Sequence, residues 1–164
     1  MIPLEFQVGD RVVHWAYGLG EIVQLDEKKL SGQALLYYVV RIADLKLWVP
    51  VENAGHSSLR LPTAVGEFEK LFTILKSAEE PLSEDRMERK RQLGEQMRTR
   101  SSASICRVIR DLTFFGRRKK LSENDQEILN RAKSFLLNEW NVSFSISLRD
   151  AEHDLDELLG DNLV

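Results

Sequence analysis

Basic side chains are concentrated in the middle of this 164-residue chain, between residues 86 and 120. The segment holds twelve Lys and Arg residues against three acids, although the whole chain has a net charge of −3. Clustered cationic groups neutralise phosphates and release counterions, so the segment predicts a surface that binds nucleic acid. The charge pattern equally allows a solvated helix face whose bases pair with the acidic residues after position 120, where ten acids stand against three bases.

Residues that could support catalysis or metal binding do not form a constellation in the sequence. The three histidines, His14, His56 and His153, belong to different predicted elements, and the common nucleotide, zinc-protease and serine-hydrolase motifs are absent. Cys106 is the single cysteine, so it cannot form an intramolecular disulfide, and we expect it to be a small buried side chain on a helix. The sequence therefore predicts a protein that is not an enzyme and needs no cofactor or metal.

The apolar content of the chain is dispersed. No apolar run approaches 18 residues, and the first ten residues have neither the basic start nor the apolar stretch of a signal peptide. We therefore expect a cytoplasmic protein with no membrane partner.

The first 62 residues are predicted to form β structure. Strands are expected at residues 11–14, 21–25, 35–42 and 46–51, with a short edge strand at 58–61. Glycines predict turns at residues 18–20 and 31–32. Five short strands joined by glycine turns favour a small, strongly bent, barrel-like sheet.

After Pro62 the apolar spacing becomes helical. Helices are expected at residues 65–76, 84–98 and 104–115, then from the capping-box-like Ser122 to about residue 140, and at 148–159 behind Ser147. Gly116 is expected to end the third helix. The predicted fold class is thus α+β, with a β domain over residues 1–62 and an all-helical domain of about four or five helices over 63–164. The basic block 86–120 lies on the second and third of these helices.

The strand at residues 45–51 carries the clearest candidate for a protein contact. Alternation places Lys46, Trp48 and Pro50 on the face opposite the aliphatic side chains. An exposed tryptophan beside a lysine has the composition of an interaction hot spot. Alternatively, Trp48 packs beneath the helix that begins near Val65, because both faces of a small barrel are often partly covered.

Motifs in both halves carry a resemblance to a known family. They are Phe6-x-x-Gly9-Asp10, Tyr17-Gly18-x-Gly20 and Val49-Pro50-Val51-Glu52-Asn53 in the first half, and Val108-Ile109-Arg110-Asp111-Leu112 and Leu121-Ser122 in the second. In order and spacing they resemble the CarD/CdnL family of bacterial transcription regulators over nearly the whole chain. The first half is also similar to the RNA-polymerase-interacting domain of transcription-repair coupling factor.

The resemblance implies a Tudor-like β domain that docks on the RNA polymerase β subunit. It also implies a helical domain that contacts promoter DNA at the upstream edge of the melted bubble and so stabilises the open complex. The polymerase-contact positions of the family fall on Lys28 and Trp48, and Lys46 and Pro50 complete the predicted polymerase-binding set. Trp48 stands where relatives commonly carry an arginine, which favours an aromatic contact over a salt bridge. We expect the protein to act as a monomer.

The same resemblance places the DNA-facing helix of the family at Arg86 and the residues after it. Relatives begin this helix with a tryptophan that wedges against an unstacked base, and Arg86 occupies that position here. An arginine can stack on a base or hold a phosphate, but it is a poorer wedge than an indole. The predicted DNA-binding residues are Arg86, Arg89, Lys90 and Arg91. The missing indole leaves open an alternative, a polymerase-binding adaptor that recruits a second protein without wedging DNA.

Overall fold

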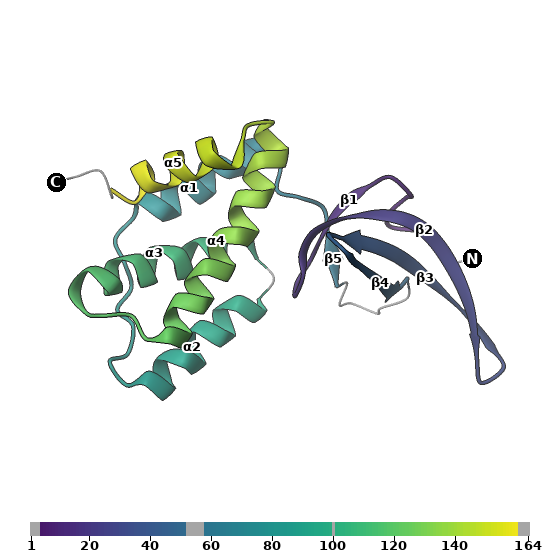
Figure 1. The fold of residues 1–164 in the computed structure, drawn as a ribbon, viewed down its shortest axis with the longest axis horizontal. Coiled ribbons are helices and arrows are strands. Elements are labelled where there is room, and N and C mark those ends of the chain that lie inside the picture. Colours follow the sequence, from purple (N-terminus) through teal and green to yellow (C-terminus); the bar gives the residue numbers. More distant parts are fainter. Residues whose placement is uncertain (1–3, 52–57, 100, 161–164) are drawn as a thin grey trace. The chain divides into compact units, whose positions relative to one another are not determined.

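The computed structural model describes residues 4–51, 58–99 and 101–160. Contacts divide the chain into two compact units, Met1–Pro62 and Thr63–Val164 (Figure 1). Four residues discussed above lie outside the described residues. They are Glu52 and Asn53 of the family motif, Arg100 of the basic block, and His56. The first unit is built of strands and the second of helices, which confirms the α+β class. None of the described helices is both long enough and apolar enough to span a bilayer.

The β unit is a single antiparallel sheet with the strand order β4-β3-β2-β1-β5. Its strands are β1 (Arg11–His14), β2 (Gly18–Leu30), β3 (Gln33–Ile42), β4 (Leu45–Pro50) and β5 (Leu59–Arg60). The predicted turn between β2 and β3 is confirmed, and positive φ angles at Ser31 and Gly32 suit the tight hairpin turns that match strand twist. The register between β2 and β3 shifts between Ile22 and Gln24, as at a β-bulge.

Two details of β2 differ from the sequence prediction. Gly18 and Gly20 lie within the strand rather than in a turn, where they pair with His14 and Val12. A Cβ atom on Gly20 would come within 2.4 Å of the Ile42 side chain, so glycine is needed for the close approach of β3. The strand also continues past its predicted end at residue 25, and Lys28 therefore lies within it, opposite Leu35 of β3.

One face of the bent sheet forms the core of the β unit. The buried residues that pack together there are Phe6, Val12, Ile22, Tyr38, Val40, Ile42, Val49 and Leu59. Because side chains alternate along a strand, this core assigns the neighbours of Val49, including Trp48, to the opposite face.

The helical unit contains a short 3-10 turn and five α-helices. These are η1 (Val65–Glu67), α1 (Phe68–Lys76), α2 (Arg86–Arg98), α3 (Ser102–Arg118), α4 (Glu123–Phe144) and α5 (Leu148–Leu158). The predicted caps are confirmed, since the Ser122 hydroxyl accepts from the backbone N–H of Asp125 in a capping box and Ser147 accepts from that of Asp150.

Gly116 does not end α3 as predicted, because the helix continues to Arg118. A Cβ atom at Gly116 would lie only 3.2 Å from the side chain of Leu121, so the glycine makes room for the segment that leads into α4. Its role is therefore close packing and not a change of backbone direction.

The core of the helical unit is an apolar cluster with contributions from all five α-helices, among them Phe68, Leu93, Ile109 and Leu155. Cys106 is fully buried in it, as predicted, and burial raises the pKa of its thiol to about 12. The first residue of the unit is fixed by α4. The backbone N–H of Thr63 donates to a carboxylate oxygen of the buried Glu139 at 2.9 Å, and the Thr63 carbonyl accepts from Ser143.

Candidate functional site

On the outer face of the β unit, Trp48 contacts Lys28, which stands 20 positions earlier in the sequence. Trp48 on β4 is 43% exposed, and the Nζ atom of Lys28 on β2 lies 4.6 Å from the centre of its ring. The Trp48 indole N–H donates to Asp26 at 2.9 Å. These contacts connect β2 with β4 across β3, so the sheet holds in place an indole that remains exposed.

The structure places the other two predicted polymerase-binding residues on the same strand. Lys46 and Pro50 are both exposed on β4, at two residues on either side of Trp48. The described sheet ends at β4, which leaves one side of this strand without a neighbouring strand among the described residues. We call Lys28, Lys46, Trp48 and Pro50 the tryptophan face. The apolar core of the β unit lies on the other side of the sheet, so Trp48 does not belong to it.

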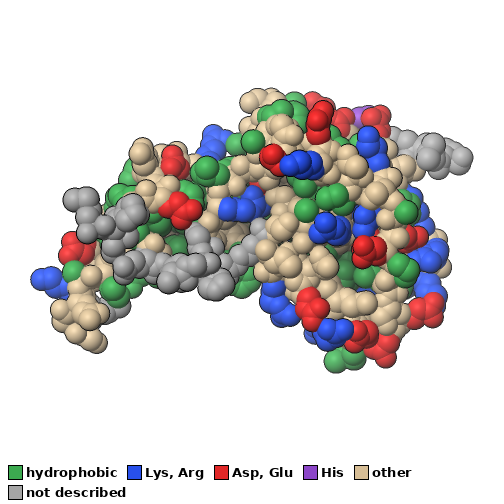
Figure 2. Space-filling model, turned by 180° about the vertical axis from the view of Figure 1, so that it is seen from behind, with side chains coloured by type: hydrophobic (Ala, Val, Ile, Leu, Met, Phe, Trp, Pro, Cys, Tyr) green, Lys and Arg blue, Asp and Glu red, His purple; other side chains and the backbone are tan. Residues whose placement is uncertain are grey.

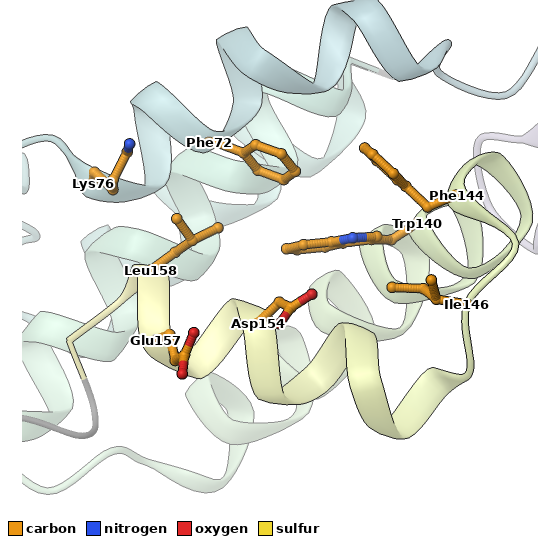
Figure 3. Close-up of a pocket in the computed structure, with 8 residues that line it drawn as sticks. All are labelled: Phe72, Lys76, Trp140, Phe144, Ile146, Asp154, Glu157 and Leu158. Carbon is orange, nitrogen blue, oxygen red and sulfur yellow. The ribbon is translucent and has the colours of Figure 1, made fainter.

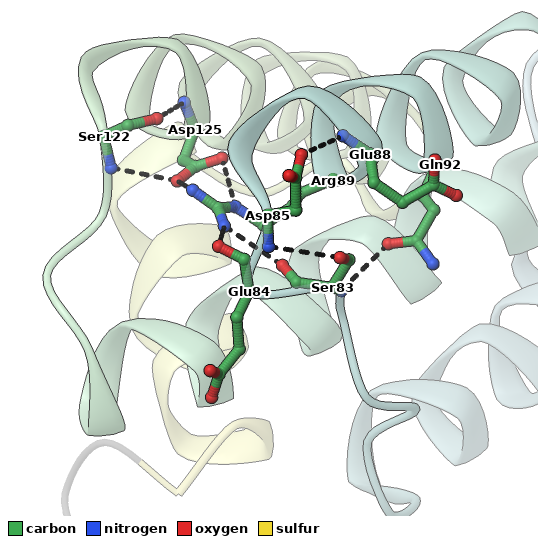
Figure 4. Close-up of polar contacts among 8 residues, drawn as sticks. All are labelled: Ser83, Glu84, Asp85, Glu88, Arg89, Gln92, Ser122 and Asp125. Atoms are coloured by element: carbon green, nitrogen blue, oxygen red, sulfur yellow. Dashed lines mark hydrogen bonds and ion pairs between the residues drawn. The ribbon is translucent and has the colours of Figure 1, made fainter.

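In the helical unit, Arg89 is buried rather than displayed (Figure 4). Its Nε and Nη2 atoms donate to the two carboxylate oxygens of Asp125 at 2.9 and 2.8 Å, and its Nη1 atom donates to the carbonyls of Ser83 and Glu84. The guanidinium carbon also lies 4.7 Å from the centre of the Phe115 ring. This corrects the prediction that Arg89 contacts DNA, because its guanidinium is used to hold α2 against the start of α4.

The partner carboxylate belongs to the capping box of α4. Burial alone would raise the pKa of Asp125, but the hydrogen bonds from Arg89 and Ser122 together with the charge of Arg89 outweigh it and hold the pKa below its usual value. Asp125 is therefore ionised at neutral pH, and one side chain both starts α4 and fixes the orientation of α2. This orientation decides which face of α2 meets solvent.

The exposed face of α2 retains three of the four predicted DNA-binding residues. Arg86 and Lys90 are exposed and make no hydrogen bond or ion pair with the described part of the chain. A groove of about 420 Å³ runs along this face toward α4 and is lined by Met87, Lys90, Arg91, Gly94, Arg98, Asn124 and Ile128. We call Arg86 together with these lining residues the α2 groove. Its cations and its apolar floor suit a phosphate backbone with exposed bases.

Arg91 differs from its neighbours because acidic residues on the same helix already bind it. Its guanidinium forms ion pairs with Glu88 and, at 2.7 Å, with Glu95. The hydrogen bond from Arg91 lowers the pKa of Glu88, and Glu88 and Glu95 in turn raise the pKa of Arg91. The three side chains together carry one negative charge, so they weaken the positive potential of α2 where they stand.

The rest of the basic block is largely engaged within the helical unit. Arg110 is buried against Asp111 and Ser77, and Arg117 donates to the carbonyl of Leu159. At the end of α3, Arg118 and Lys119 form ion pairs with Glu79 and Glu84, and the Lys119 hydrogen bond lowers the pKa of Glu84. On the face drawn in Figure 2, basic side chains of the helical unit are interspersed with acidic ones. The carboxylates that pair with Arg110, Arg118 and Lys119 lie before position 120, and not after it as the solvated-face interpretation expects. Three cations with no partner among the described residues, Arg86, Lys90 and Arg98, lie on α2.

Comparison with known families connects these two surfaces. Residues 70–156 match the model described as "CarD, C-terminal domain", and residues 6–61 match the model described as "CarD-like/TRCF RID domain". The chain belongs to the CarD family. It is 25% identical over 139 residues to the Bacillus subtilis (strain 168) protein named "Putative transcription factor YdeB", a match that covers 84% of this chain and 91% of that protein.

CarD family membership confirms the resemblance found in the sequence and makes this chain one of a family of transcription factors related to RNA polymerase interaction. The tryptophan face lies within the stretch that matches the RID domain, and the α2 groove within the stretch that matches the CarD C-terminal domain. Sequence reasoning missed Met87, Arg98 and Asn124 as members of the groove. The spacing of Lys90 and Arg98, eight residues apart on a helix, was the signal that could have found Arg98.

Proposed function

We propose that this CarD family protein binds the RNA polymerase β subunit through the tryptophan face and upstream promoter fork DNA through the α2 groove. It thereby stabilises the open complex. The observation that carries the proposal is that each unit of a two-part CarD chain presents one exposed, chemically suitable surface. No step of chemistry is required of the protein, because its contribution is to bridge two partners.

The polymerase contact is supported by the way Trp48 is held. An exposed indole that is fixed by Asp26 and flanked by Lys28 offers a large contact area with little side-chain entropy left to lose. The neighbouring open side of β4 is a place where a partner strand can add to the sheet through backbone hydrogen bonds.

The DNA contact is supported by the unpaired cations of α2. Arg86, Lys90 and Arg98 can each neutralise a phosphate without first breaking an ion pair with the described residues. Phosphate contacts position a protein without reading sequence, so one surface of this kind serves many promoters. Met87, which is 76% exposed, is the apolar side chain next to Arg86, the position where relatives carry the indole, and methionine is among the residues that proteins insert between bases.

The test for DNA binding compares two triple variants with the same change of charge. Replacing Arg86, Lys90 and Arg98 with alanine is expected to weaken binding to forked DNA and to flatten the slope of log affinity against log salt by roughly three units, about one for each lost phosphate contact. The matched control replaces Arg118, Lys119 and Lys120, which lie at the end of α3, and is expected to change both quantities much less.

Three single variants separate the roles of Arg86 and Met87 at the start of α2. Met87→Ala is expected to reduce the preference for forked over duplex DNA without changing the salt slope, whereas Arg86→Ala is expected to flatten the slope. Arg86→Trp is expected to keep or increase the fork preference, because an indole stacks on an exposed base better than a guanidinium does.

The polymerase arm is tested with Trp48→Ala in a pull-down with isolated β-subunit fragments. If Trp48 is a hot spot, the variant is expected to bind about 1–4 kcal/mol more weakly with an unchanged melting temperature. The control is Trp15→Ala, a second exposed tryptophan of the β unit that follows β1 and not β4. Polymerase binding without any loss of DNA affinity in the α2 triple variant would favour the adaptor function instead.

A further inference from the structure

The helical unit contains a second cavity that neither proposed contact uses. It measures about 450 Å³ and lies among α1, the C-terminal end of α4 and α5 (Figure 3). Its apolar lining comes from Phe72, Trp140, Phe144, Ile146 and Leu158, and its polar lining from Lys76, Asp154 and Glu157. This size and this composition, an apolar wall with a few polar groups, are typical of sites for small molecules.

Three aromatic rings form much of the wall. The ring centres of Phe72 and Trp140 are 4.9 Å apart, and Phe144 stands 6.1 Å from Phe72 and 6.4 Å from Trp140. Trp140 is only 3% exposed, so it forms the floor, while the other two rings are half-buried. The faces of aromatic rings carry partial negative charge and attract cations, and they also provide surfaces on which a flat apolar group stacks.

The carboxylates add negative charge beside these rings. Asp154 is half-buried, its carboxylate is drawn toward Trp140, and it has no hydrogen bond or ion pair within the described part of the chain. Glu157 follows one turn later on α5 and lies 3.1 Å from the Nε2 atom of His153. Lys76 is the basic residue of the lining and forms no ion pair with the described residues, so the two carboxylates outnumber it.

The C-terminal ends of three helices add to the negative potential at the cavity. The last residues of α1, α4 and α5 are Lys76, Phe144 and Leu158, and all three line the cavity. The C-terminal end of a helix carries partial negative charge from its unsatisfied carbonyl groups and favours a nearby cation. Aromatic faces, an unpaired carboxylate and three helix C-termini thus all favour positive charge at one place.

We propose that this cavity binds a small organic cation with a flat apolar body, of the amidinium or aryl-alkylamine class. The cationic group pairs with Asp154, and the apolar body packs against the half-buried rings of Phe72 and Phe144, with Trp140 beneath them. The ammonium group of Lys76 opposes such a ligand, because it adds like charge to the same space. The site is independent of the polymerase and DNA contacts, since none of its residues belongs to the tryptophan face or the α2 groove.

The experiment is a titration of the full chain with benzamidine, followed by the indole N–H signals of the three tryptophans in nitrogen-15 NMR spectra. Benzoate and benzamide have nearly the same shape but are anionic and neutral. Benzamidine is expected to shift the Trp140 signal with a Kd of roughly 10 mM or tighter, the range that ligand efficiency allows for a molecule of its size. Trp15 and Trp48 serve as internal controls, because both lie in the β unit.

Variants identify the groups responsible. Asp154→Asn is expected to weaken benzamidine binding about tenfold, as the loss of a charge-assisted hydrogen bond predicts. Lys76→Met is expected to strengthen it, and Glu152→Gln, an exposed carboxylate of α5 outside the cavity, to leave it unchanged. The same spectra report whether each variant is folded. No Trp140 shift, equal shifts with all three compounds, or unchanged affinity in Asp154→Asn would overturn the proposal.

Discussion

Replacing Arg89 with alanine is expected to destabilise the helical unit rather than to act first on DNA binding. The substitution leaves the Asp125 carboxylate, whose side chain is only 2% exposed, without the two donors that now lie 2.9 and 2.8 Å from its oxygens. It also removes the donor that two carbonyls at the start of α2, those of Ser83 and Glu84, share.

The expected loss follows from this burial. Removing one partner of a buried, bidentate ion pair costs about 3–5 kcal/mol, because the other charge stays in a site where water reaches it poorly. The carbonyls of Ser83 and Glu84 are partly accessible and can bind water instead, so they add little. Arg91, by contrast, is 56% exposed in its ion pairs, and each such pair is worth only about 0.2–1 kcal/mol.

The assay is urea unfolding of the full chain at neutral pH, followed by helical circular dichroism. Arg89→Ala is compared with Lys90→Ala, the next residue, which is exposed and is expected to change the free energy of unfolding by no more than about 0.5 kcal/mol. Asp125→Ala and the double variant complete a thermodynamic cycle. The double variant is expected to lose less stability than the sum of the single variants, by about 0.5–3 kcal/mol, because the two residues stabilise each other.

One combination of results would refute this reasoning. If Arg89→Ala is as stable as Lys90→Ala and also flattens the salt dependence of DNA binding, then Arg89 faces solvent and contacts phosphate. The buried pair would then play no part in orienting α2.

Three further predictions follow from the titratable groups. Because the pKa of Asp125 is lowered in the folded state, its stabilisation is present above about pH 4 and is lost as the pH falls through the folded-state pKa, so Asp125→Asn should flatten the acid decline measured by urea unfolding at several pH values. Changing Glu88 and Glu95 to glutamine should free Arg91 and steepen the salt dependence of fork-DNA binding by roughly one unit, and an unchanged slope would mean that Arg91 does not reach the DNA. Cys106, with a thiol pKa of about 12, should react with a thiol reagent at pH 8 only as fast as the helical unit opens, and rapid labelling of the native protein would contradict its burial.

Local sequence determined most of the secondary structure. Ser122 and Ser147 begin α4 and α5 as predicted, and the hairpin turn lies at Ser31 and Gly32, because caps and turns depend on contacts within about four residues. Motif order likewise identified the family. The errors lay at Gly20, which the close approach of Ile42 and Arg41 on β3 requires, and at Gly116, after which α3 continues to Arg118.

Tertiary structure alone decided which basic residues of α2 are exposed and able to contact a partner. Arg89, Lys90 and Arg91 are neighbours in the sequence with equal charge. Arg89 is buried, Lys90 is exposed without a partner among the described residues, and Arg91 is paired with acids of its own helix. Each residue turns about 100° around a helix, and only the position of α4 fixes which direction points inward. The partner that buries Arg89, Asp125, is 36 residues away in the chain, so composition and spacing could determine the charge of this region but not the surface that carries it.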